Sequence, residues 1–238
     1  NRELLKPQPM TLKYAKDLLP AYWCSSFDHK GSILKVEIYA GVSDEIESEG
    51  GWNIFCNDRL ILDRDTTKIT GWTGAGSDGV AKYHQQFWGF RGYVFFSAKD
   101  STLLPWNTTK TGIDPDSSDY LAARKKMIEM MKDVFLLLNR QKKEREKDNP
   151  EKKQILNKKI REAKPLSIIE IIKKKEKLSA KFRFPSNFGA VKEKDSKNIK
   201  YTVPLVKFNR VKKRLGATAP SDVGSKTFDY YYEREVGD

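Results

Sequence analysis

The residues of this sequence with the clearest chemical potential surround one lysine. Lys110 follows Thr108 and Thr109 and precedes Thr111 within the segment LLPWNTTKTG. A lysine ammonium is a point charge that binds phosphate, and nearby hydroxyl and amide groups add hydrogen-bond donors. The segment therefore predicts a phosphate-binding loop made by Thr108, Thr109, Lys110 and Thr111. The alternative is an ordinary solvated loop, since surface lysines are common.

Outside this loop the chain offers little catalytic chemistry. Its two histidines, His29 and His84, and its two cysteines, Cys24 and Cys56, do not fall at metal-ligand spacing. The glycine-rich stretch Gly71–Gly79 lacks the Gly-Lys-Ser/Thr ending of a P-loop. We expect no metal site, and we do not expect the chain by itself to catalyse a reaction.

The elements on either side of Lys110 are the ones that must position it. Gly92–Phe96 (GYVFF) is an aromatic and β-branched run that predicts a central strand. Residues 97–116 contain two prolines and predict a long loop, a kind of segment that often carries function. Ser117 or Ser118 then predicts the N-cap of a helix whose apolar positions recur through Tyr120–Leu138.

Further strands precede this unit. Ile33, Val36, Ile38 and Tyr39 form an apolar core that predicts a strand ending at Gly41. Residues 52–57 alternate apolar and polar side chains, which also predicts a strand. The pair Asn57-Asp58 is a turn signal, and residues 60–62 predict the second strand of the hairpin.

Basic residues are concentrated in the second half. Residues 1–110 carry 13 lysines and arginines against 13 acidic residues, whereas residues 142–183 carry 16 against 7. A basic segment beside a neutral domain favours a polyanion partner, most often nucleic acid, and the alternative is a solvated charged helix. The residues of this segment that we expect to contact nucleic acid are Lys173, Lys174 and Lys175.

The same basic segment has few apolar positions. Pro150 and Pro165 interrupt it, and Ser167 predicts the cap of a helix that carries four isoleucines. This pattern favours a charged helical hairpin or coiled-coil arm without a core of its own.

Three short motifs together resemble a known family. Gly51–Leu60 (GWNIFCNDRL) is similar to the strand and turn of the GHKL-type ATPases represented by MutL, and Pro105–Lys110 resembles the lysine loop of MutL and gyrase. The helix Tyr120–Leu138 falls where MORC-like members have theirs, and the wider stretch with Phe90–Phe96 looks like bacterial ATP-binding proteins of this superfamily. The resemblance covers roughly residues 33–140, so less than half of the chain.

This resemblance implies a transducer domain. In such proteins a separate N-terminal domain binds ATP and Mg²⁺, and a transducer lysine reaches the γ-phosphate. Lys110 would be that catalytic lysine, with Thr108, Thr109 and Thr111 shaping the loop. The chain lacks the motifs of the ATP-binding domain, carries Asp58 where MutL-like proteins usually have Gly, and has no His in the expected place before Lys110. We therefore expect a parent protein that is an ATPase.

The C-terminal residues predict a small β-α-α module. Residues 199–203 alternate like a strand, Leu205–Leu215 predicts a helix stopped by Gly216, and Pro220 begins a second helix. The order resembles a ribbon-helix-helix module, in which Lys200 and Thr202 would face DNA. The alternative is a module that only packs or dimerises.

The predicted fold class is α+β, with a transducer-like sheet and crossover helices followed by a charged helical arm and the small module. The predicted domains are a connector at 1–30, a transducer-like α/β domain at 31–140, the basic arm at 141–184 and the module at 196–238. The expected partners are the protein's own N-terminal ATPase domain, DNA and a second copy of the chain. Reduced thiols and the lack of a long apolar run predict a cytoplasmic protein without membrane contact. The first residue is Asn1, not Met, which predicts a fragment or a processed product.

Overall fold

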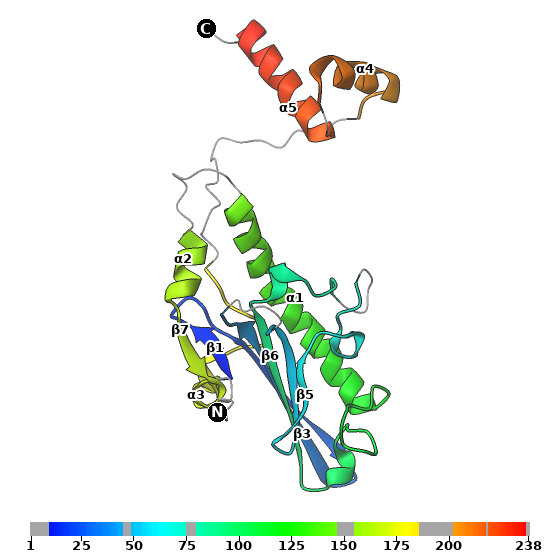
Figure 1. Cartoon of the computed structure of the whole chain (residues 1–238), viewed down its shortest axis with the longest axis vertical. Coiled ribbons are helices and arrows are strands. Elements are labelled where there is room, and N and C mark those ends of the chain that lie inside the picture. The colour runs from blue at the N-terminus through cyan, green and yellow to red at the C-terminus, as the bar shows by residue number, and fades with distance from the viewer. Residues whose placement is uncertain are drawn as a thin grey trace, which may run out of the picture. The chain divides into compact units, whose positions relative to one another are not determined.

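A computed structural model of the chain describes residues 10–44, 49–74, 80–146, 155–185, 202–217 and 219–236 (Figure 1). The fold is α+β, as the sequence predicts, and the chain divides into two units, Asn1–Ala190 and Val191–Asp238. Strands and helices of the first unit lie in the following ranges: β1 Thr11–Tyr14, β2 Ala21–His29, β3 Ser32–Val42, β4 Gly51–Cys56, β5 Arg59–Asp65, β6 Phe90–Ala98, α1 Ser118–Glu146, α2 Ile155–Glu162, β7 Lys164–Ser167 and α3 Ile168–Ile172.

A five-stranded sheet with the order β2-β3-β6-β4-β5 forms the centre of the first unit. Its neighbouring strands are antiparallel except for β4 and β6, which are parallel. The chain travels from β4 to β6 through β5 and two short 3₁₀ turns, η1 (Lys68–Thr70) and η2 (Gln85–Phe87). Among the described residues no α-helix crosses between these strands, so the prediction of crossover helices is wrong. The central position of β6 is as predicted.

Helix α1 covers one face of this sheet (Figure 1). Met127, Met131 and Val134 are fully buried there, in one cluster with Val36 and Val94 of the strands. The helix begins where expected, because the Ser117 hydroxyl accepts a hydrogen bond from the Tyr120 amide and caps the first turn. Burial of this apolar stripe is the main source of stability for a helix whose exposed face is highly charged.

The opposite face of the sheet is covered in part by a two-stranded sheet of β1 and β7, together with α3. Leu12, Leu166 and Ile171 pack there against Tyr39 and Tyr93 of the large sheet. Two predicted boundaries are therefore wrong. Residues 10–29 are not a connector, since they form β1 and β2. The basic segment is not only a helical arm, since its strand β7 pairs with β1 and Leu166 of β7 is buried against the sheet.

The second unit contains α4 (Leu205–Leu215) and α5 (Pro220–Tyr231), followed by a π-helical segment at Tyr232–Val236. Both helices were predicted. Gly216 ends α4 with a left-handed φ of 58°, a conformation that glycine adopts without strain. The predicted strand is not formed at Thr202 and Val203, and residues 199–201 lie outside the described part of the chain.

Candidate functional site

The loop that carries Lys110 leaves the end of β6 and returns to the start of α1. Its stem is a bridge between Trp106 and Ile113, and the Asn107 amide donates to the Gly112 carbonyl over 2.8 Å. The Ile113 side chain is buried in the main core, so the stem is anchored. The base of the loop is therefore fixed to the domain.

Asn107 organises the tip of the loop. Its side-chain oxygen accepts hydrogen bonds from the Thr109 hydroxyl at 3.0 Å, from the Thr111 amide at 3.0 Å and from the Gly112 amide at 3.3 Å. The Thr109 and Thr111 hydroxyls are also 2.8 Å apart. An asparagine that satisfies several backbone donors fixes a tight turn. Two of the predicted binding threonines thus have a role in shaping the loop, whereas Thr108 is simply exposed.

Lys110 lies at the tip of this turn. Its backbone has a left-handed φ of 55°, which is uncommon for a residue with a side chain. The ammonium lies 4.8 Å from the centre of the Trp106 ring, within the range of a cation–π contact. In the described part of the chain it makes no ion pair, and the residue is exposed. The cation is therefore accessible to an anionic group on another molecule.

A hydrogen-bonded pair ties the neighbouring elements together. His29, at the end of β2, contacts Asp119, in the first turn of α1, with 2.8 Å between Nε2 and Oδ2. The Asp119 carboxylate in this first turn also interacts favourably with the positive end of the helix dipole. We name this end of the sheet, with the β2–β3 turn, the β4–β5 turn, the loop and the start of α1, the Lys110 end.

Asn57 fixes the β4–β5 turn at this same end. Asn57 and Asp58 have φ values of 45° and 64°, which makes a tight hairpin turn of the expected kind. The Asn57 amide group donates to the Ala98 carbonyl and accepts from the Ala98 amide, at 2.8 and 3.0 Å. The turn is thereby attached to the end of β6, from which the Lys110 loop starts.

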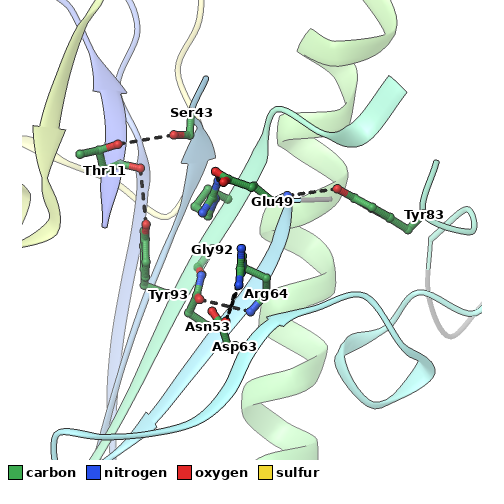
Figure 2. Close-up of polar contacts among 11 residues, drawn as sticks. Thr11, Ser43, Glu49, Asn53, Asp63, Arg64, Tyr83, Gly92 and Tyr93 are labelled. Atoms are coloured by element: carbon green, nitrogen blue, oxygen red, sulfur yellow. Dashed lines mark hydrogen bonds and ion pairs between the residues drawn. The ribbon is translucent and has the colours of Figure 1, made fainter. Parts of the chain in front are cut away.

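The other end of the sheet, which we name the Arg91 end, contains a group of polar contacts (Figure 2), and Asn53 and Arg91 are buried there. Asn53 is 5% exposed, donates to the Gly92 carbonyl and accepts from the Arg64 amide. Arg64 has a left-handed φ of 48° in an irregular part of the β4–β5 pairing. An irregular pairing leaves backbone donors without a ladder partner, and Asn53 supplies one acceptor.

Arg91 and Glu49 form an ion pair at 3.6 Å beside this asparagine, and their side chains are 8% and 13% exposed. The Tyr83 hydroxyl accepts from the Gly50 amide, and the Tyr93 hydroxyl donates to the Thr11 carbonyl (Figure 2). Burial raises the pKa of the Tyr93 phenol to about 12, so it stays protonated and serves as a donor. These contacts have the character of structural supports, and the sequence did not single them out.

The three lysines predicted to contact nucleic acid do not form one free surface. Lys173 and Lys174 are exposed after α3, but the Lys175 ammonium lies 3.4 Å from a Glu37 carboxylate oxygen. Burial would raise the pKa of Glu37, yet hydrogen bonds from Lys35 and Tyr22 and the charges of Lys35 and Lys175 outweigh it and lower that pKa. Lys175 therefore has a structural partner within its own unit.

Of the two residues of the C-terminal module that were predicted to face DNA, the structure describes only Thr202. Thr202 is exposed in a segment without regular structure ahead of α4. Lys200 lies outside the described residues.

Sequence reasoning missed a set of buried polar residues on three elements. Lys13, Gln141 and Asn157 are 5%, 4% and 2% exposed. One signal was available for Gln141, which falls three residues after buried Leu138 on the apolar stripe of α1. No comparable pattern marked the other two, because the elements that bury them are brought together only by the fold.

Comparisons with known proteins give no relative for this chain: no protein-family profile, no curated protein and no solved structure matches it. No helix within the described ranges has the length and apolar character needed to cross a membrane.

Proposed function

We propose that this chain is the transducer part of a GHKL-type ATP-binding protein, and that Lys110 contacts the terminal phosphate of an ATP molecule held with Mg²⁺ by a separate domain. The observation that carries the proposal is the exposed, left-handed Lys110 at the tip of a loop fixed by Asn107. A cation held at a fixed position can stabilise charge on a phosphoryl group without reorganising during the reaction.

The position of the loop provides a route for mechanical coupling. It connects β6, the central strand, with α1, a helix of 29 residues that extends about 44 Å. The far part of α1 packs on α2 through Gln141 and Asn157. A displacement of the loop on phosphate release would therefore move one end of a long rigid element. Downstream basic segments would follow that movement.

Substitution of Lys110 in the ATP-binding parent protein tests this proposal. Lys110→Ala is expected to lower ATP turnover on the order of a hundredfold, since one preorganised charge near the reacting phosphate is lost. Nucleotide affinity and thermal stability should change little, because the side chain is exposed. Steady-state ATPase rates and nucleotide titrations on the same preparations measure both quantities.

Lys99→Ala is the matched control, because Lys99 is also an exposed lysine and lies just after β6, away from the loop tip. ATP turnover by the Lys99→Ala variant should equal that of the unmodified protein. If Lys110→Ala and Lys99→Ala have the same ATPase rate, Lys110 is not the transducer lysine.

DNA binding by the C-terminal unit is a second candidate function, supported by the charge of α4. This helix contains five basic residues and no acidic residue: Lys207, Arg210, Lys212, Lys213 and Arg214. If these residues contact phosphates, DNA affinity should fall steeply with added salt. Replacing both Lys213 and Arg214 by Gln should lower the slope of log affinity against log salt by about 2. A salt response that stays flat in the unmodified chain would point to an ordinary solvated helix.

A further inference from the structure

The indole ring of Trp106 lies beside the Lys110 ammonium. The distance from Lys110 Nζ to the centre of the ring is 4.8 Å, which is within the range of a cation–π contact. The tryptophan is partly buried and packs against the main core of the first unit, whereas the lysine is exposed. The contact therefore joins a flexible charged side chain to a ring that the fold holds in place.

Trp106 is held by its backbone as well as by its side chain. It forms the bridge with Ile113 at the stem of the loop, and its amide donates to the Leu104 carbonyl over 2.9 Å. Ile113 and Leu104 both have buried side chains in the main core. Packed cores leave side chains little room to move, so the face of the Trp106 ring is a fixed reference point for the ammonium.

A lysine side chain does not by itself hold its charge in one place, because its four-carbon stem rotates freely in water. The bonds of Asn107 fix the backbone of the loop tip: its carbonyl accepts from the Lys110 amide over 2.9 Å, and its side chain accepts from the Thr111 amide over 3.0 Å. These bonds do not reach the ammonium. The Trp106 ring acts on the charged end of the side chain instead.

An aromatic ring suits this task because it attracts a cation without neutralising it. A carboxylate partner would cancel the charge of the lysine and repel the oxygens of a phosphate. A ring face offers only the weak negative potential of its quadrupole, and it occupies one side of the ammonium. The N–H donors on the other sides stay available to phosphate oxygens.

We propose that Trp106 is the positioning residue for Lys110, and that its ring holds the ammonium in the orientation that meets the terminal phosphate of ATP. This role rests on the function proposed for Lys110 and adds a second residue to that site. The ring reduces the number of orientations that the lysine gives up when phosphate arrives, and a preorganised charge lowers a reaction barrier more than a mobile one. Changes at Trp106 should therefore alter turnover only through Lys110.

The contact itself is measured by ¹H–¹³C NMR on the 238-residue chain without nucleotide. Protons over an aromatic face resonate upfield, so the Lys110 ε-methylene signals should lie upfield of those of Lys99, which is also exposed. Trp106→Leu should abolish this difference. Hydrogen exchange at the Thr111 amide should keep its rate in the variant, because its acceptor is Asn107, and it reports that the loop is intact. Coincident Lys110 and Lys99 signals in the unmodified chain would overturn the proposal.

ATP turnover by the parent protein tests the role of the contact. Trp106→Leu keeps an apolar side chain but removes the ring, and we expect kcat to fall about fivefold with KM for ATP within about twofold. Trp106→Phe keeps a smaller ring and should recover most of this loss. In the Lys110→Ala background, Trp106→Leu should have no further effect, because no ammonium is left to position. A packing role alone would lower turnover in both backgrounds.

Trp23→Leu is the matched control. Trp23 is also partly buried against the main core, but it pairs with Ile38 in the middle of the sheet. Its loss should leave kcat within about twofold. If Lys110→Ala leaves turnover unchanged, the function proposed for the loop fails and the positioning role fails with it. If Lys110→Ala slows turnover, the role of Trp106 alone is overturned by any of three results: an unchanged or faster Trp106→Leu variant, equal losses for Trp106→Leu and Trp23→Leu, or a further loss in the Lys110→Ala background.

Discussion

The two ends of the five-stranded sheet differ in how they satisfy their polar groups. At the Lys110 end, asparagines fix exposed turns, and Asn57 is the clearest case. At the Arg91 end, Asn53 makes a similar pair of bonds but is buried beneath other elements. Water can replace a lost partner at the first end, but it has little access to the buried bond between Asn53 and the Gly92 carbonyl at the second. Asparagine hydrogen bonds should therefore contribute more to stability at the Arg91 end. At the Lys110 end they fix exposed turns and leave the Lys110 ammonium accessible.

The largest loss of stability is expected for Gly92→Ala, which tests how tightly the buried Arg91 end is packed. A Cβ atom at this position would lie 2.2 Å from Trp52, a fully buried ring that packs against Phe90. We expect a loss of about 3 kcal/mol in the free energy of unfolding, because the ring has little room to move. Chemical denaturation measures it.

Gly41→Ala is the matched control, since Gly41 pairs with Arg91 across β3 and β6. A Cβ atom there would make contacts of 3.4 Å or more, which is ordinary packing distance. Its effect should stay within about 1 kcal/mol. Equal losses for the two variants would show that the close approach of Trp52 does not determine the stability of this end.

Asn53→Ala should have the next largest effect. It removes the side-chain partner of the buried Gly92 carbonyl and of the part-buried Arg64 amide, at a cost of about 1–3 kcal/mol. Backbone hydrogen exchange at Arg64 should also become faster, because its amide loses the side-chain acceptor. Unfolding curves and exchange rates for the variant measure both effects, and an unchanged exchange rate at Arg64 would contradict the proposed role of Asn53.

Asn57→Gly is the counterpart at the Lys110 end and should have the smallest effect. It removes two hydrogen bonds to Ala98, but water can reach both groups and glycine suits the left-handed φ of 45°. The expected loss is below about 1 kcal/mol by the same denaturation assay. A loss as large as that of Asn53→Ala would remove the distinction between the two ends.

Elements with strong local signals were found from the sequence. The Asn57-Asp58 turn, the start of α1 after Ser117 and the end of α4 at Gly216 all follow from the preferences of the residues themselves. Ser167 also caps α3 as expected, through reciprocal bonds with Glu170. These features depend on contacts within a few residues, so the identities of neighbouring residues suffice to predict them.

Elements defined by distant contacts were missed. Strand β1 pairs with β7, so Thr11 lies beside Ser167, more than 150 positions further along the chain. Trp72 falls in the glycine-rich stretch Gly71–Gly79, whose composition is typical of a loop, yet it packs against Phe87, Phe90 and Phe135. A residue's burial depends on what the fold places over it, and no local pattern carries that information.

The sequence by itself determined the α+β class, the exposed Lys110 loop between a strand and a helix, and the basic character of the second half. Only the tertiary structure decided that the basic segment packs on the sheet, and that Lys13, Gln141 and Asn157 meet in one cleft. The physical reason is the range of the interactions. Turn and cap preferences act between neighbours, whereas burial and charge compensation depend on groups that come together only when the chain folds.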